Sequence, residues 1–192
     1  MSDDPRSSRR KNEEEYFQKK DRELVEKMRE QAKRAQQLRE LGEQIGVTDP
    51  HVSRELAELG FTTETVKLLP LLPIIETAWA EGGVSGSERK MVVNLARARG
   101  MAAGSAADEQ LVEWLDRRPD EALFRSARRL ISALFAEGGR FDLTPDDLLE
   151  YCEAIAEASG GLFGIGRVSS EERATLERIA TEIRSRQKQP ES

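Results

Sequence analysis

The sequence predicts an all-α protein: a compact helical bundle of about seven helices with internal pseudo-duplication, preceded by a long amphipathic N-terminal helix. Three observations predict this fold class. Hydrophobic residues make up 38%, charged residues 34% and aromatic residues 5% of the 192 residues, a balance typical of helical proteins with charged outer faces. Apolar residues recur three and four positions apart along most of the chain, and no stretch has the pattern of a strand. A short phrase of glycine, valine and serine occurs twice, each time before such a stretch.

Composition and periodicity divide the chain into segments. The two ends are polar and charged without a helical period, which is typical of disordered tails. The expected segments are a disordered tail over 1–11, a long amphipathic helix over 12–45, a short helix or connector over 46–60, the helical domain over 61–186 and a disordered tail over 187–192.

The expected helix over 12–45 carries an interrupted apolar seam. Positions alternately four and three apart line one face of a helix, and most of them here are apolar. Such a face predicts self-association as a short coiled coil, binding to a protein partner, or packing on the rest of the chain. Asp21, Gln31 and Gly42 interrupt the seam, so these alternatives stay open. The seam positions hold Phe17, Asp21, Leu24, Met28, Gln31, Ala35, Leu38, Gly42 and Ile45.

Start and stop signals place the remaining helices within 61–186. A serine, threonine or aspartate precedes each apolar stretch, as a helix cap does, and glycine follows most of them. Pro70 and Pro73 lie in a leucine-rich stretch capped by Thr62 or Thr63, and they predict a break or kink there. The other expected starts are at Ser85, Ser105, Asp120, Thr144 and Ser169.

The repeated phrase has a structural explanation. The first copy runs over 80–89 and the second over 164–173, with a weaker echo over 136–139. In both full copies a serine is followed three residues later by a glutamate, which is the spacing of a capping box. The phrase therefore predicts two similar helix starts and a duplicated helical domain more directly than it predicts a chemical activity.

The residues from about Phe61 to Arg186 resemble the TerB-like family, the small all-helical domain of tellurite-resistance proteins and of a membrane-anchored DnaJ-type co-chaperone. The resemblance covers about two thirds of the chain. It implies a bundle of two similar halves, a stress-response or interaction role, acidic patches that bind cations, and a peripheral membrane-associated complex as one setting. The matching stretches are Leu68 to Ser85 with Glu88-Arg89, Leu130 to Gly138, and Gly164 to Ser169 with Glu172, Leu176 and Ile179.

Acidic residues near the helix ends are candidates for a divalent-cation site. Carboxylate oxygens are the ligands that hard cations prefer, although no spacing here matches an EF-hand loop. A divalent cation is the one cofactor that these residues suggest. The competing interpretation is that they are helix caps and solvated acids. The candidates are Glu81, Glu88, Glu137, Asp142, Asp146 and Asp147.

Residues 38–60 resemble a helix-turn-helix DNA reader, which gives an alternative function. Gly46 and Val47 match the turn, and Val52 and Leu56 match inward positions of a recognition helix. The side chains expected to face DNA include His51, Ser53 and Arg54, beside two glutamates. Residues 46–192 hold 18 Lys/Arg against 25 Asp/Glu, so nucleic acid is not the expected partner.

The sequence carries no catalytic motif. It has a single histidine, no phosphate-binding loop with its lysine, and one cysteine, Cys152, expected to be an inert buried thiol. No apolar run has the length of a transmembrane helix or a signal sequence, which predicts a cytoplasmic protein. The leading expectation is a non-enzymatic interaction module whose partner, or second copy, binds residues 12–45. An inert helical scaffold without a cation site is the remaining alternative.

Overall fold

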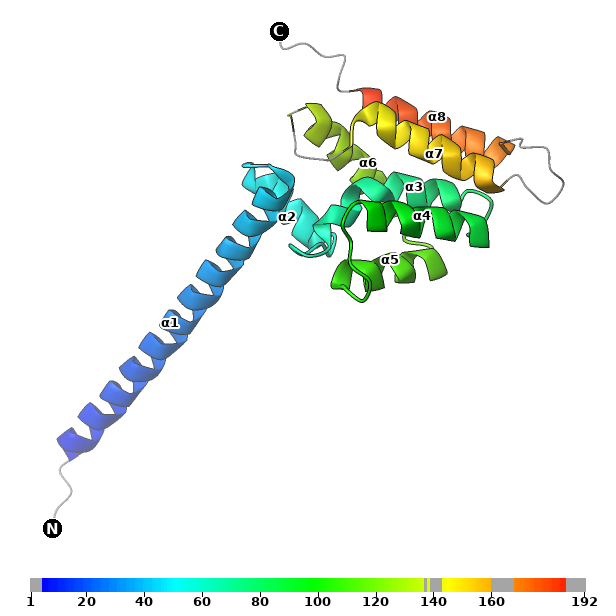
Figure 1. Cartoon of the computed structure of the whole chain (residues 1–192). Coiled ribbons are helices and arrows are strands. Elements are labelled where there is room, and N and C mark those ends of the chain that lie inside the picture. The colour runs from blue at the N-terminus through cyan, green and yellow to red at the C-terminus, as the bar shows by residue number, and fades with distance from the viewer. Residues whose placement is uncertain (1–4, 137, 139–142, 160–167, 186–192) are drawn as a thin grey trace, which may run out of the picture.

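The computed structural model describes residues 5–136, 138, 143–159 and 168–185. Within these residues the chain is entirely helical, which confirms the all-α fold class (Figure 1). The expected helix starts at Ser85, Ser105, Asp120, Thr144 and Ser169 all precede observed helices. The elements are α1 (Pro5–Ile45), α2 (Pro50–Glu58), the 3₁₀ helix η1 (Val66–Leu71), α3 (Leu72–Ala78), α4 (Gly86–Ala98), α5 (Ala106–Asp116), α6 (Glu121–Ala136), α7 (Pro145–Ser159) and α8 (Ser170–Ser185).

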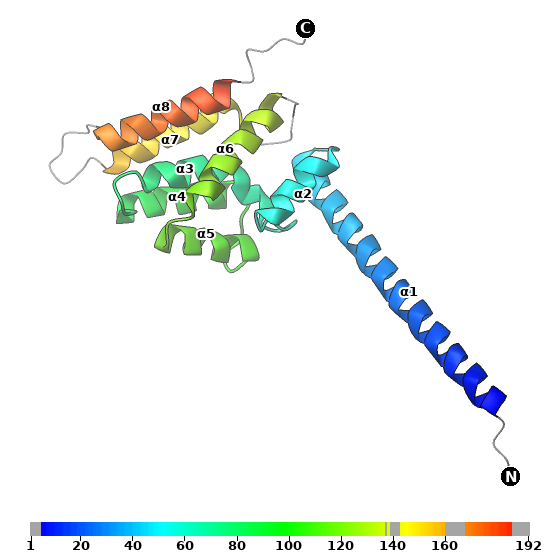
Figure 2. The same cartoon turned by 180° about the vertical axis from the view of Figure 1, so that it is seen from behind.

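Helix α1 extends away from the bundle as one straight rod, and opposite views agree on this (Figures 1 and 2). Its 41 residues span about 60 Å at the α-helical rise. The helix begins at Pro5, so the expectation of a disordered tail over 1–11 is corrected for residues 5–11. Lysine, arginine and glutamate favour helix even where no apolar period exists, and proline at a first helical position loses no hydrogen bond. The tail over 187–192 lies outside the described residues.

The two prolines divide the expected leucine-rich helix. Pro70 lies inside η1, and the α-helical hydrogen bonding of α3 begins only at Leu72, with Pro73 in its first turn. Thr65, rather than Thr62 or Thr63, directly precedes η1, and Thr62 and Thr65 bond each other's backbone amides and side chains in the preceding turn. The predicted break is confirmed, and its cause is the backbone amide that each proline lacks.

The bundle contains two helix pairs, α3 with α4 and α7 with α8 (Figure 1), and α6 packs against both α3 and α8. The inner helices α3 and α7 pack against each other. The outer helices reach across, because α4 contacts α7 and α8 contacts α3. In each pair the repeated phrase precedes the second helix, so the arrangement matches the predicted pseudo-duplication. The pairs bury mainly aliphatic side chains, with Ile74, Ile75, Leu148 and Ile179 fully enclosed.

The hydrophobic core crosses the expected boundary at residue 61. Leu41 and Ile45 of α1 and Leu56 of α2 are buried in the same cluster as the leucines of η1 and α3. The expected short helix over 46–60 is present as α2, and its buried Leu56 shares one core with the helices after residue 61. No helix in the described part of the chain has the length and apolar character needed to cross a membrane.

Candidate interaction surface and polar sites

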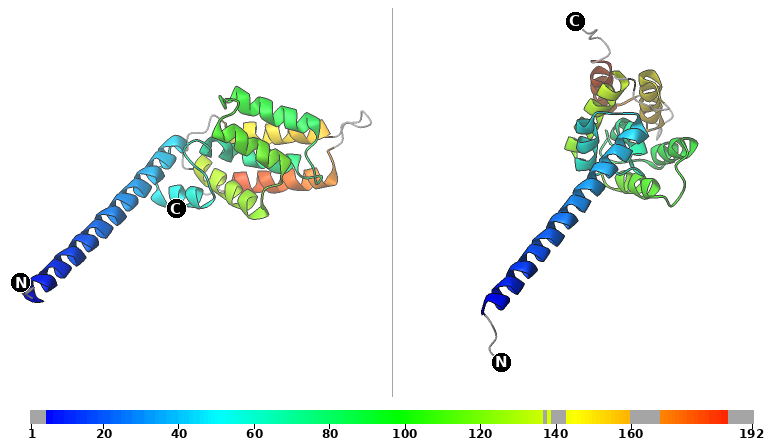
Figure 3. Two further views of the ribbon diagram at one scale, coloured as in Figure 1. Left: turned by 90° about the horizontal axis from the view of Figure 1, so that it is seen from below. Right: turned by 90° about the vertical axis from the view of Figure 1, so that its left-hand side faces the viewer.

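The N-terminal part of α1, residues 16–37, projects from the bundle, and we call it the arm. Every side chain along it is exposed, and burial begins at Leu38. Figure 3 shows that no other helix of the described chain runs beside it. Large apolar side chains remain in water here: Phe17 is 63%, Leu24 56% and Met28 59% exposed. Together with Ala35 and Leu38 they form one line along α1, the apolar row.

The two flanks of the apolar row differ in charge. Lys20, Lys27 and Arg34 are seven residues apart, so they follow one edge of the row and all are exposed. The other edge carries Val25 and Ala32. Most glutamates of the arm lie on the opposite side of the helix. One edge of the apolar row is therefore positively charged and the other is weakly apolar.

A pocket of about 320 Å³ lies where the arm meets the body. Arg34, Leu38 and Leu41 line it from α1, and Phe61 and Thr62 line it from the segment after α2. The charged edge and the apolar row thus lead directly into a hollow with an aromatic wall.

Helix α2 packs closely on the end of α1. A Cβ atom on Gly42 would lie 2.6 Å from the Ser53 hydroxyl and 2.7 Å from the Val47 carbonyl, so only glycine permits this approach. Asp49 caps α2 by accepting a hydrogen bond from the His51 amide at 2.8 Å. Close helix packing and helix capping therefore explain the helix-turn-helix pattern of this segment, and DNA binding is not needed to explain it.

The three candidate DNA-contacting residues differ in their exposure to solvent. His51 and Arg54 are exposed, but Ser53 is only 3% exposed and faces Gly42. The expectation that Ser53 is available to a groove is corrected, because the two helices are too close for its side chain to leave the interface. Glu55, on the same helix, forms an ion pair with Arg129 of α6. The exposed face of α2 thus offers one arginine beside Glu58.

The repeated serine and glutamate form capping boxes, as their spacing predicts. The Ser85 amide donates to the Glu88 carboxylate at 2.7 Å, and the Glu88 amide donates to the Ser85 hydroxyl at 3.2 Å. Ser169 and Glu172 repeat the pattern at 2.7 and 3.1 Å. Both glutamates are buried. Their carboxylates accept hydrogen bonds from the backbone amides that precede α4 and α8, so their role is structural.

The two capping boxes lie close together at one end of the bundle. Burial raises the pKa of Glu88, hydrogen bonds from Ser85 oppose this, and the charges of Glu172 and Glu81 raise the pKa further. The Ser87 hydroxyl donates to the Ala158 carbonyl at 3.1 Å and so joins the start of α4 to the end of α7. Glu81 itself is exposed. This end of the bundle gathers negative charge.

The four cation candidates that the structure describes, Glu81, Glu88, Asp146 and Asp147, do not lie together. Asp146 and Asp147 lie in the first turn of α7, about 20 Å along that helix from the end that contacts Ser87. Asp147 caps α7 by accepting from the Thr144 amide at 2.9 Å, and this bond lowers the pKa of its carboxyl. Glu137 and Asp142 lie outside the described residues. Among the residues that are described, no three potential ligands form a metal-binding group.

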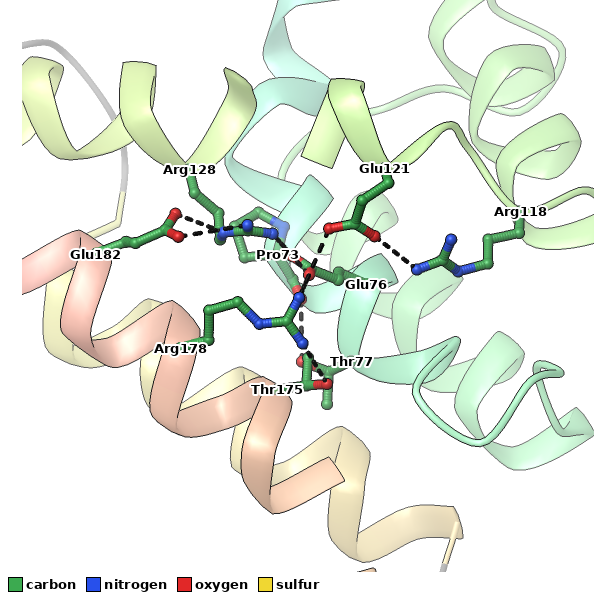
Figure 4. A network of polar contacts seen from close by, with 9 residues as sticks. All are labelled: Pro73, Glu76, Thr77, Arg118, Glu121, Arg128, Thr175, Arg178 and Glu182. Carbon is green, nitrogen blue, oxygen red and sulfur yellow. Dashed lines mark hydrogen bonds and ion pairs between the residues drawn. The ribbon is translucent and has the colours of Figure 1, made fainter. Parts of the chain in front are cut away.

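A buried ion-pair network joins α3, α6 and α8 (Figure 4). Nη1 of Arg128 donates to both carboxylate oxygens of Glu76, at 2.5 and 2.6 Å, and Nε donates to Glu182 at 2.6 Å. Glu76 and Arg128 are each 2% exposed. Arg178 adds a second cation 3.5 Å from Glu76 and 3.6 Å from Glu121. Three helices that are distant in sequence are therefore fixed by one charged cluster.

Burial and charge oppose each other in this network. Burial raises the pKa of Glu76, and the positive charge of Arg128 only partly offsets it. Burial also lowers the pKa of Arg128, but the hydrogen bond to Glu182 and the charge of Glu76 outweigh it and hold the guanidinium protonated. Removal of one partner from such a pair would leave the other charge buried and uncompensated. In the described part of the chain no buried side-chain nitrogen or oxygen lacks a partner.

Sequence reasoning missed this network. The available signal was a charged residue at an apolar position: Arg128 lies between Phe124, Ala127 and Ile131 on the buried face of α6. Glu76 similarly lies within the buried run of α3. The network's partners come from helices about fifty residues apart, so no local spacing identifies them.

Cys152 is fully buried in α7, and burial raises the pKa of its thiol to about 12. The thiolate is the reactive form of cysteine, and it is suppressed at neutral pH. The expected burial of this thiol is confirmed.

Comparison of the chain with models of protein families, with curated proteins and with solved structures finds no match.

Proposed function

We propose that this chain is a non-enzymatic interaction module in which a rigid helical body presents the arm of α1 to a protein partner. The observation that carries the proposal is the apolar row. Phe17, Leu24 and Met28 are each more than half exposed along one face of a projecting helix. Ordered apolar surface of this kind marks interaction sites in folded proteins, and helix-to-helix docking is a common way to cover it.

The body supports this proposal as a platform. The core encloses the end of α1 through Leu41 and Ile45, so the direction of the arm is set by the bundle. The two neighbouring capping boxes and the paired helices agree with the TerB-like resemblance, and the family's stress-response role and a cytoplasmic location remain part of the proposal. Cation binding is not part of it, because Glu88 and Asp147 already serve as caps.

DNA binding is the weaker candidate. Ser53 is enclosed against Gly42, and Glu55 is paired with Arg129, which leaves few groups to contact a phosphate backbone. Phosphate contacts dominate protein–DNA affinity and require several exposed cations on one face.

Site-specific photocrosslinking tests the proposal. A photoreactive residue at Leu24 is expected to form an adduct with one protein in the source cells. The same residue at Glu26, on the opposite side of the helix, is expected to form none. Binding of the identified protein should then weaken roughly tenfold or more for Leu24→Gln, because a buried leucine contributes about 1.5–3 kcal/mol. Equal adducts at the two positions would contradict a directional docking surface.

A further inference from the structure

We propose that the arm binds one α-helix whose apolar seam is flanked by aspartate or glutamate, and that the two helices form a heterotypic coiled coil. This inference rests on the proposed function, since it names the chemical class of the partner for the same surface. The charge of the arm's exposed edge and the geometry of the apolar row carry it.

The spacing of the apolar row fits a single helix. Phe17, Leu24 and Leu38 are separated by multiples of seven residues, and Met28 and Ala35 by seven. A seven-residue repeat keeps one seam toward one neighbouring helix along its whole length. The same seam continues to Ile45, where α2 and η1 already cover it. The arm is therefore the uncovered continuation of an existing helix-packing surface.

A parallel second copy fits this seam poorly. In parallel pairing each seam position faces itself, so Asp21 would oppose Asp21 of the second copy. Edge residues pair with positions five further along the partner, which would place Arg34 against Arg39 of the second copy. Both contacts bring like charges together, and like charges at such positions are unfavourable.

An antiparallel second copy meets the same difficulty on its charged edge. The seam itself could match, with Leu24 facing Met28 of the other copy. In antiparallel pairing, however, the same edges of the two helices face each other. Lys27 would then oppose Lys27 of the second copy, and Lys20 would oppose Arg34. Neither orientation of a homodimer places a carboxylate opposite Lys27 or Arg34, and Lys20 has only Glu23 of its own helix, 4.0 Å away.

An acidic helix satisfies both parts of the surface. Its apolar side chains would cover Phe17, Leu24 and Met28. Its carboxylates would lie beside Lys20 and Lys27, which have exposed side chains. At the body, the bound helix would reach Arg34 and the pocket behind it, where one apolar side chain could contact Phe61.

Two designed helical peptides of about four heptads provide the test. Both carry leucine at every seam position. The acidic peptide has glutamate at its edge positions, and the basic peptide has lysine there. Titration calorimetry with the full chain is expected to give roughly tenfold tighter binding of the acidic peptide at low salt, from several edge pairs of a few tenths of a kcal/mol each. The preference should shrink as salt is added.

Charge reversal on the arm provides the matched control. The variant Lys20→Glu/Lys27→Glu/Arg34→Glu is expected to reverse the preference in favour of the basic peptide. The control variant Lys19→Glu/Arg29→Glu/Lys33→Glu makes the same change in net charge away from the row, and it should keep the preference for the acidic peptide. Circular dichroism of both variants verifies that they fold.

The outcomes separate the inference from the proposed function. Equal binding of both peptides, or tighter binding of the basic one, overturns the acidic partner and leaves α1 as a docking surface. A stable dimer of the chain alone in sedimentation also overturns it, in favour of a second copy. Absence of binding by either peptide, together with a monomeric chain, contradicts docking by the arm itself.

Discussion

The two ends of α1 carry one seam but have opposite environments. At the body, the seam residue Ile45 is 2% exposed, enclosed by a cluster that includes Leu41 and Leu56. Along the arm, Leu24 and Met28 are more than half exposed. The residue types and their spacing are alike, so the difference comes from what lies beside the helix. Periodicity specifies which face of a helix is apolar, whereas the surrounding chain decides whether that face is covered.

The charged groups follow the same contrast. The body encloses Glu76 and Arg128 in a network with several partners, while the arm leaves Lys20 and Lys27 in water. Loss of its partner costs a buried charge about 3–5 kcal/mol, whereas an exposed ion pair contributes about 0–1 kcal/mol. Matched substitutions in the body and in the arm should therefore change the free energy of unfolding by different amounts.

The largest effect is expected at Arg128. Arg128→Met leaves Glu76 buried with Arg178 as its remaining cation, and removing one partner of a buried pair costs about 3–5 kcal/mol. Lys27→Met on the arm should change stability by less than about 0.5 kcal/mol. Urea unfolding of the two variants measures the difference. If Arg128→Met is as stable as the parent, the network does not hold the three helices together.

The next largest effect concerns the seam itself. Ile45→Ala should destabilise the protein by about 2–5 kcal/mol, because it leaves a cavity in the core. Leu24→Ala makes a comparable deletion on the arm and should cost less than about 0.5 kcal/mol, because the side chain contacts no other element. Thermal and urea unfolding compare the two. Similar losses at both positions would mean that the arm packs against the body in solution.

A smaller, pH-dependent effect is expected at the first capping box. Glu88 has a raised pKa in the folded protein, from burial first and the charges of Glu172 and Glu81 next. Between its ordinary pKa of 4.5 and the raised value, the folded state binds more protons than the unfolded state, so stability rises as the pH falls through the raised pKa. Glu88→Gln removes this contribution while keeping an oxygen for the Ser85 amide.

Unfolding free energies of the parent and Glu88→Gln, measured from pH 7 down to 4.5, provide the comparison. The difference should move in favour of the parent as the pH decreases. Glu26→Gln on the arm serves as the charge control. Parallel curves for the parent and Glu88→Gln would show that the buried carboxylate titrates no differently in the folded and unfolded states.

The smallest effect is expected from removing part of the arm. Deletion of residues 1–33 removes only exposed side chains among those described, so the melting temperature should change by less than about 2 °C. Deletion of residues 1–45 also removes Leu41 and Ile45 from the core and should lower it much further. A large decrease on the shorter deletion would assign the arm a stabilising role within the chain.

The local structure was largely predictable from sequence because its causes are local. Ser85 and Glu88 form the capping box that their spacing predicts, and Pro70 and Pro73 break the helix where the missing amides require it. The fold class followed from these signals together with the apolar period. Helix α1 begins at Pro5 and not at the expected residue 12, because charged residues continue a helix without any apolar period to indicate it.

The tertiary features were not predictable in the same way. The contact of Glu76 with Arg128 joins residues fifty-two positions apart, and no pattern within one helix contains it. The sequence predicts Ser53 to be a surface residue, but the packing of α2 against Gly42 buries it. The seam of α1 was recognised, but its division into a covered end and an uncovered arm depends on where α2 and η1 lie.

Hydrogen exchange along α1 tests the central claim most directly. In the free chain, the amides of residues 16–37 are expected to exchange much faster than those of α3, because an unsupported helix opens readily while a core helix opens only with the fold. Addition of the acidic peptide should slow exchange around Phe17, Leu24 and Met28 and leave α3 unchanged. An arm that is already protected in the free chain, or one that the peptide leaves unprotected, would contradict a free docking surface.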